Sequence, residues 1–135
     1  MAIDRRNLKA FQECLRQKKS IEATYDWCKC RIECQNTLLC EGRIQPDENC
    51  PSYKIKIRYR FGKVPHVHVV EPEIKRTSAT HVYKGGSLCL YFPEEQQWTD
   101  DQLIADTIIP WTAEWLLYYE LYLISGKWEG PEVGH

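Results

Sequence analysis

The chain has 135 residues, of which 43% are hydrophobic and 27% are charged. These values are close to globular averages, so they exclude a disordered, collagen-like or low-complexity protein and predict one folded domain over residues 1–135. The formal net charge of −1 argues against a general nucleic-acid binder. No apolar run approaches the roughly 18 residues that a membrane span needs, and the N-terminus lacks a signal-peptide core, so we expect a cytoplasmic protein.

The first segment is predicted to be a helix from about Asp4 to Lys18. Asp4 is an acceptable N-cap. Leu8, Phe11 and Leu15 form a narrow apolar stripe at i, i+3 and i+7, and many of the remaining positions are basic. Such a helix can pack by one side and offer a positive surface on the other.

Charge is distributed unevenly along the chain. Residues 1–88 carry 17 Lys/Arg against 10 Asp/Glu, a net charge of +7, whereas residues 89–135 carry one Lys against nine acidic residues, a net charge of −8. A molecule polarised in this way can be steered towards charged protein surfaces, although solvated faces alone also explain the pattern.

After the first helix the hydrophobic period changes to two, which is typical of strands with one buried face. The clearest strand spans residues 53–61, where apolar residues alternate with lysine and arginine. Similar alternation predicts strands over residues 28–34 and 38–44, and a short fourth strand over residues 66–69. These segments describe an antiparallel meander of about four strands with one polar face.

The last third of the chain is predicted to be helical. Thr99 and Gln102 form a capping box, which indicates the start of a helix. Pro110 suits the first turn of a second helix, and Gly126 suits its end. Aromatic residues recur every three or four positions within this second helix, which favours a core-facing stripe: Trp111, Trp115, Tyr118 and Tyr122. The predicted order of elements is a helix, a four-stranded meander, an irregular stretch and further helices. This order is typical of an α+β fold.

Seven cysteines are the main departure from average composition, and their odd number excludes a fully paired intramolecular disulfide framework. In a reducing cytosol these cysteines are expected to be core thiols, metal ligands or a nucleophile. Cys14 fits a structural position in the first helix, and Cys50 has no evident chemistry. Four others fall on apolar faces of the predicted strands, where a free cysteine behaves as a small hydrophobe: Cys28, Cys30, Cys34 and Cys40.

A zinc site built from the strand cysteines is an alternative, with Cys50 or the pair His66 and His68 as further ligands. Zinc sites favour Cys-x2–4-Cys spacings on turns, where the chain can wrap the metal. A Cys-x-Cys pair within a strand does not provide that wrap. We therefore interpret these cysteines as packing residues and expect no metal, with a small zinc-binding protein kept as an alternative.

Cys89 stands in a different context, because it follows two glycines in the sequence GGSLCL of residues 85–90. The glycines allow an open or positive-φ backbone just before the thiol. His81 lies eight residues upstream, and the segment falls between the predicted sheet and the C-terminal helices. Functional cysteines often occupy such loops on rigid scaffolds, although a buried cysteine after a Gly-Gly turn fits the same sequence.

The order of elements and this segment together resemble the ubiquitin-conjugating enzyme family. That family places its thioester-forming cysteine in the pattern Gly-x-apolar-Cys-Leu, which residues 86–90 match. Trp98 follows at nearly the family spacing, and Pro65 and Val67 resemble the proline-bearing start of the family's fourth strand. The basic first helix is similar to the one with which family members dock their activating enzyme. Over roughly residues 4–109 the resemblance implies an N-terminal helix, a four-stranded antiparallel meander, an active-site loop and C-terminal helices.

The chain departs from the family in its His-Pro-Asn triplet, whose positions hold Ala79, Thr80 and His81. His81 thus stands where the oxyanion-supporting asparagine would be. The short tail is similar to compact prokaryotic members, in particular the stand-alone conjugating-enzyme-like proteins of short type II CBASS antiphage operons. These accompany a cGAS/DncV-like nucleotidyltransferase and are thought to act on its C-terminus without a separate activating enzyme.

The resemblance implies acyl transfer through a thioester on Cys89, acting on the C-terminal glycine of that nucleotidyltransferase in bacterial antiphage defence. A thiolate is a good nucleophile and a good leaving group. The tetrahedral oxyanion needs a preorganised donor, and His81 is the candidate. This mechanism requires no cofactor, nucleic acid or membrane. The alternative is a non-catalytic interaction module of the same fold, which docks by its basic first helix or its aromatic tail.

Overall fold

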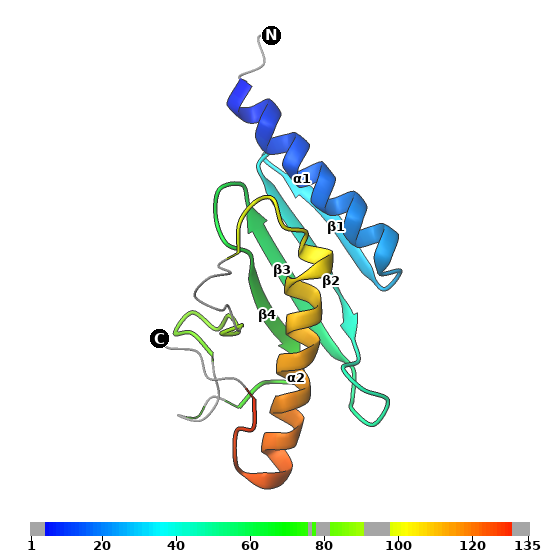
Figure 1. Ribbon diagram of the computed structural model, residues 1–135, viewed down its shortest axis with the longest axis vertical. Coiled ribbons are helices and arrows are strands. Elements are labelled where there is room, and N and C mark those ends of the chain that lie inside the picture. Colours follow the sequence, from blue (N-terminus) through cyan, green and yellow to red (C-terminus); the bar gives the residue numbers. More distant parts are fainter. Residues whose placement is uncertain (1–4, 76, 78–81, 91–97, 131–135) are drawn as a thin grey trace.

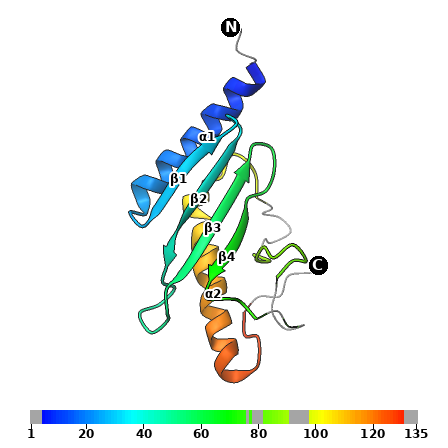
Figure 2. The ribbon, with the colours of Figure 1, turned by 180° about the vertical axis from the view of Figure 1, so that it is seen from behind.

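The computed structural model describes residues 5–75, 77, 82–90 and 98–130. Two long α-helices, α1 (Arg5–Thr24) and α2 (Ile108–Ser125), lie on the same side of a four-stranded sheet (Figure 1). Viewed from behind, the sheet stands in front of both helices (Figure 2). The core therefore lies between the helices and one face of the sheet.

The sheet is an antiparallel meander in the order β1 (Cys28–Glu33), β2 (Thr37–Ile44), β3 (Tyr53–Arg60) and β4 (His66–Glu71). Alternate residues of β3 are buried beneath the helices and their neighbours point to the other face, as a period of two requires. The predicted α+β fold with a four-stranded meander is confirmed. The other face carries exposed basic side chains: Lys29, Arg31, Arg43, Lys56, Arg58 and Arg60.

The buried stripe of α1 differs from the predicted one. Leu8 and Phe11 are 45% and 38% exposed, and Asp4, the predicted N-cap, lies outside the described residues. The helix continues past Lys18 to Thr24, and its C-terminal half packs against β1 and β2. This longer contact sets the buried face, which consists of Ala10, Cys14, Gln17 and Ile21.

One predicted helix is replaced by a turn and a short 3-10 helix. The side chain of Gln102 accepts a hydrogen bond from the N–H of Thr99 at 3.3 Å, which is half of the predicted capping box. The segment then continues only as η2 (Ile104–Asp106), so the expectation of an α-helix from Thr99 is wrong.

Side chains of α1 explain this difference, because they occupy the backbone groups that an α-helix would pair internally. Arg16 donates to the carbonyl of Asp100 at 2.6 Å. The amide of Gln17 donates to the carbonyl of Gln102 at 2.8 Å and accepts from the N–H of Ile104 at 2.9 Å. An α-helix would have used the carbonyl of Asp100 for the N–H of Ile104. Tertiary contacts thus override the local helix signal.

The second predicted helix is confirmed at both ends. Pro110 lies in the first turn of α2, and the helix ends at Gly126, whose φ of 76° is left-handed. The predicted aromatic stripe is only partly in the core, since Trp115 is buried but the other three residues are half-buried. Trp128 covers this side of the helix, with its ring 5.4 Å from that of Trp115 and 6.3 Å from that of Tyr118.

Candidate functional site

The thiol singled out by the sequence lies on a short loop, residues 82–90, termed the Cys89 loop. Within it the N–H of Tyr83 donates to the carbonyl of Ser87, and the N–H of Gly86 donates to the carbonyl of Tyr83, both at 2.8 Å. Gly86 has a φ of 97°, which residues with a side chain rarely adopt. The glycines therefore close a tight turn just before the thiol.

Leu88 joins this loop to the sheet. Its N–H donates to the carbonyl of Val67 in β4 at 2.9 Å, and Leu88 also forms an antiparallel bridge with Val82. Leu88, Cys89 and Leu90 are all buried. The loop thus fixes Cys89 beside the edge of the sheet, with its side chain turned away from solvent.

Burial controls the chemistry of the Cys89 thiol. The residue is 1% exposed, and desolvation raises the pKa of its thiol from 9.0 to about 11. A hydrogen bond between the thiol and the hydroxyl of Tyr83 acts in the opposite direction and lowers this pKa. In this arrangement the thiol is protonated at neutral pH, and acyl transfer requires that the loop open or that a positive group approach the sulfur.

His81 lies outside the described residues, as do Ala79 and Thr80. The pairing of His81 with Cys89 therefore stays a prediction. In the sequence, His81 immediately precedes Val82, the first residue of the Cys89 loop.

Two tyrosines of α2 hold the chain that leads towards His81. The hydroxyl of Tyr119 accepts a hydrogen bond from the N–H of Lys75 at 2.8 Å. The hydroxyls of Thr77 and Tyr122 are hydrogen-bonded to each other at 2.9 Å. α2 therefore contacts the chain after β4 at Lys75 and Thr77.

An open groove of about 640 Å³ borders the Cys89 loop. It runs between the end of β4 and the following chain on one side and the loop on the other. Polar and apolar groups contribute about equally to its lining, which includes Val69, Glu73, Ile74, Lys75, Val82, Gly86 and Leu88.

Trp98, which the family spacing singled out, has a structural position. It is buried, its ring packs edge-on against Tyr59 at 5.4 Å, and its Nε1 donates to the hydroxyl of Thr107 at 3.1 Å. The hydroxyl of Tyr59 donates in turn to a carboxylate oxygen of Asp100 at 2.6 Å. These contacts tie residues 98–100 to β3.

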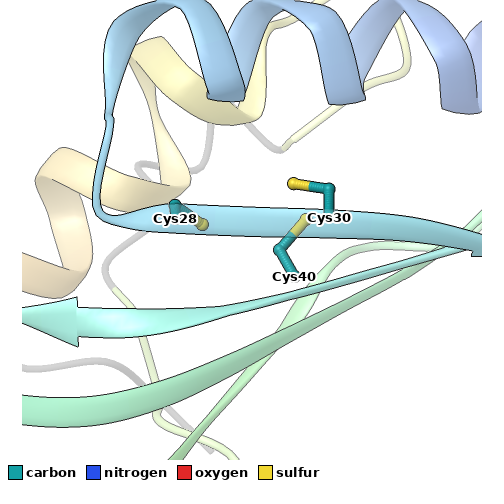
Figure 3. Close-up of side chains that lie close together, drawn as sticks. All are labelled: Cys28, Cys30 and Cys40. Carbon is teal, nitrogen blue, oxygen red and sulfur yellow. The ribbon is translucent and has the colours of Figure 1, made fainter.

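The strand cysteines separate into two groups. The sulfurs of Cys28, Cys30 and Cys40 all lie within 4.8 Å of one another between α1 and the sheet (Figure 3). The thiols of Cys30 and Cys40 donate hydrogen bonds to the sulfur of Cys28. These bonds lower the pKa of Cys28 and raise the pKa of Cys30 and of Cys40.

Cys34 does not belong to this group. β1 ends at Glu33 and the chain turns there, so Cys34 is exposed and has a φ of 53°. The prediction that Cys34 lies on the apolar face of a strand is therefore wrong.

The other residues of the alternative zinc set do not join these sulfurs. Cys50 is half-buried in the connection between β2 and β3, where its N–H donates to the carbonyl of Asp47 at 2.9 Å. His66 and His68 are exposed on the basic face of the sheet, opposite the buried cysteines. Cys14 is fully buried in α1, as its predicted structural position requires.

An N-terminal helix, a four-stranded meander, a cysteine-bearing loop and a C-terminal helix define the class of ubiquitin-conjugating enzyme-like proteins. Residues 17–135 match the family described as "Type II CBASS E2 protein", and the chain belongs to this family. No curated protein matches the chain. Membership gives the protein a conjugating-enzyme-like role in CBASS antiphage defence, with protein partners from the same operon. None of the helices in the described part of the chain is both long and apolar enough to span a bilayer.

Proposed function

We propose that this protein carries the C-terminal glycine of a partner protein as a thioester on Cys89 and transfers it to an amine. The partner is the cGAS/DncV-like nucleotidyltransferase of the same operon. The position of Cys89 carries this proposal: the thiol follows a glycine turn that borders an open groove, and the preceding residue, Leu88, is hydrogen-bonded to β4. Membership of the CBASS E2 family supports it.

The reaction consists of two displacements at one carbonyl carbon. The sulfur of Cys89 first attacks the carbonyl of a C-terminal glycine that is already activated as a thioester: the new C–S bond forms, the old C–S bond breaks, and the departing thiolate takes up the thiol proton. An amine then displaces the sulfur, which leaves as a thiolate while the amine loses a proton. Each step passes through a tetrahedral intermediate with a negatively charged oxygen.

His81 is proposed to stabilise this oxygen by an imidazole N–H, since it occupies the chain position of the family's asparagine. A protonated His81 near the sulfur would also lower the pKa of Cys89, because a positive neighbour favours the charged form of a thiol. The N–H of Gly86 donates to the carbonyl of Tyr83, so in this arrangement it is not available as a further donor to the oxyanion.

The groove supplies the binding site for the donor peptide in this proposal. An extended C-terminal tail that lies between Ile74 and Val82 would bring its last residue to the Cys89 loop. A terminal glycine suits this position because it has no side chain to clash with the turn. Displacement of the loop by the tail would expose the buried thiol at the moment when it is needed.

The proposal predicts a reductant-sensitive adduct between the two proteins. Wild-type protein is incubated with nucleotidyltransferase whose C-terminal glycine has been activated as a thioester, and the products are separated on non-reducing gels, with Cys89→Ala and a partner lacking its last glycine as comparisons. The adduct is expected only when Cys89 and the terminal glycine are both present. Cys34→Ala, which removes an exposed thiol, is the matched control and should form the adduct normally. Equal behaviour of wild type and Cys89→Ala would contradict the proposal.

The role of His81 is tested by its own substitution. His81→Ala is expected to lower the transfer rate by about 10²–10³-fold, as for the loss of one oxyanion donor, with a smaller change in partner binding. His81→Asn, which restores the family's residue, should recover part of that loss. Unchanged transfer in His81→Ala would remove the histidine from the mechanism.

The second candidate is a non-catalytic interaction module of the same fold, which the deep burial of Cys89 favours. A module of this kind needs the surface of the protein and not the thiol. Cys89→Ser would then keep full antiphage activity in cells, whereas a conjugating enzyme would lose it.

A further inference from the structure

Three thiols meet beneath α1, in a region separate from the Cys89 loop. Cys28 and Cys30 lie two residues apart on the inner face of β1, and Cys40 stands directly opposite Cys30 in β2. Their sulfurs lie within 4.8 Å of one another (Figure 3), and we term this group the sulfur cluster. Cys28 and Cys40 are buried, whereas Cys30 is half-buried.

The pairing of the strands creates this group. Residues two apart on one strand share a face, and directly opposite residues of antiparallel strands have neighbouring side chains. A Cys-x-Cys pair in a strand cannot wrap a metal ion by itself. The third thiol, supplied across the sheet by Cys40, gives three donors that converge on one point.

The charges around the sulfur cluster come from α1. A carboxylate oxygen of Glu22 accepts a hydrogen bond from the N–H of Cys30 at 2.9 Å. The other oxygen of Glu22 accepts from the ammonium of Lys18 at 2.8 Å. Lys18 is also close enough to Cys30 and Cys40 to interact with them electrostatically. The ion pair of Lys18 and Glu22 therefore lies beside the cluster, with the ammonium acting on Cys30 and Cys40 and the carboxylate on Cys28 and Cys30.

We propose that the sulfur cluster binds one Zn²⁺ ion through the thiolates of Cys28, Cys30 and Cys40, with water as the fourth ligand. Thiolate ligands select zinc and other soft metal ions over magnesium, calcium and manganese. Around a tetrahedral zinc with Zn–S bonds of about 2.3 Å, the sulfurs would be about 3.8 Å apart. The observed limit of 4.8 Å is close enough for small side-chain rotations to reach that geometry.

Charge also favours a divalent over a monovalent thiophilic ion. Three thiolates and one divalent ion leave a single negative charge, and the neighbouring ion pair of Lys18 and Glu22 adds no net charge to it. A monovalent ion such as Cu⁺ would leave two negative charges in a largely buried place, and buried unpaired charge is costly. The half-buried Cys30 marks the side on which water can reach the ion.

The test uses the full-length, reduced and metal-stripped protein. Titration with Co²⁺, a spectroscopic substitute for zinc, should give a thiolate-to-metal charge-transfer band that saturates at one equivalent and disappears when Zn²⁺ is added. Cys30→Ser is the preferred variant because this residue is only half-buried, and it should lose more than about a hundredfold in metal affinity. Cys14→Ser, which removes a fully buried thiol of α1 outside the cluster, is the matched control and should bind normally.

A second measurement separates loss of a ligand from loss of the fold. Zinc should raise the thermal midpoint of the wild type and of Cys89→Ala, because an ion that binds only the folded state stabilises it. It should leave the midpoint of Cys30→Ser unchanged. The proposal is overturned by the absence of a thiolate band, by a band that survives in Cys30→Ser, or by binding of Cu⁺ without binding of Zn²⁺. The result is independent of the acyl transfer proposed for Cys89.

Discussion

The sulfur cluster and the Cys89 loop bury cysteine in two different ways. The cluster thiols project from strands whose register is continuous from Cys28 to Glu33, and their nearest partners are other sulfurs. The thiol of Cys89 follows a glycine turn, and its partner is the hydroxyl of Tyr83. Burial alone therefore does not reveal how a cysteine is used. The atoms around the sulfur and the support of its backbone are more informative.

The two regions also differ in how much must break to expose the thiol. The hydrogen bond from Leu88 to Val67 and the bridge to Val82 hold the Cys89 loop, whereas the cluster lies within the paired strands β1 and β2. Regions with few backbone hydrogen bonds open at a lower free energy than the core of a sheet. From the bonds of the described residues, we expect the loop to release its thiol while the helix-covered sheet remains folded. The following predictions test this contrast, beginning with the largest effect.

The largest effect is expected in the framework around α1. Gln17 is fully buried. Gln17→Ala would remove the two hydrogen bonds that its side-chain amide makes with the carbonyl of Gln102 and the N–H of Ile104. Each unsatisfied buried group costs about 1–3 kcal/mol, so the free energy of unfolding should fall by about 2–4 kcal/mol in a urea titration. Gln12→Ala, at an exposed position of the same helix, is the control and should change it by less than about 0.5 kcal/mol. Equal effects would contradict the assigned role of Gln17.

A glycine substitution made in each region compares them directly. A Cβ on Gly42, which lies opposite Cys28, would stand 2.2 Å from the carbonyl oxygen of Trp27, a backbone atom. Gly42→Ala should therefore lower the free energy of unfolding by about 1–3 kcal/mol. A Cβ on Gly85 in the Cys89 loop would meet no described atom within 4 Å, so Gly85→Ala should change it by less than about 0.5 kcal/mol. Thermal or denaturant unfolding of both variants measures these changes. Similar losses of stability in Gly42→Ala and Gly85→Ala would contradict the proposed difference between the two regions.

The smallest effect on stability, with a clear effect on reactivity, is expected for Tyr83→Phe. The hydroxyl of Tyr83 lowers the pKa of Cys89, so its removal should raise that pKa further. Below the pKa the thiolate fraction rises about tenfold per pH unit. Alkylation of Cys89, followed by mass spectrometry of its peptide, should therefore keep rising to about pH 11 in the wild type. The curve of the variant should shift to higher pH, and a shift to lower pH would exclude the hydroxyl as a stabiliser of the thiolate.

The same pKa has a consequence for stability. The folded protein holds the Cys89 proton more tightly than a free thiol of pKa 9.0 does, because the folded-state pKa is about 11. This contribution to stability is complete below pH 9 and is lost as the pH rises towards 11. Alkaline unfolding of the wild type should accordingly become easier over this range, and Cys89→Ala should show a weaker dependence on pH.

Local patterns predicted most of the fold. The alternation of apolar and basic residues in β3 identified the sheet, and Pro110 and Gly126 identified the ends of α2, because these signals act over a few neighbouring residues. The helix predicted from Thr99 and the apolar stripe of Leu8 and Phe11 were wrong for a common reason. Both depend on how α1 packs against distant chain, and a local pattern does not contain that information.

The Cys89 loop and the sulfur cluster also differ in how far local sequence predicts them. The GGSLCL sequence predicted the turn before Cys89, since only the local backbone is involved. The sulfur cluster depends on the register that places Cys30 opposite Cys40, which the turn at Cys34 and Gln35 sets. Both of these turn residues have positive φ, which neither a cysteine nor a glutamine would lead one to predict. The convergence of three thiols therefore became visible only in the folded chain.

The hydrogen bond from Leu88 to Val67 also protects the margin of the sheet. β4 is the last strand in the sheet order, and an unpaired edge strand is a template on which another chain can form β-structure. While the Cys89 loop is closed, Leu88 occupies part of that edge. Opening the loop would free it. If the thiol is exposed by this movement, as proposed, the protein would become more prone to edge-to-edge aggregation, and one backbone contact would link reactivity and solubility.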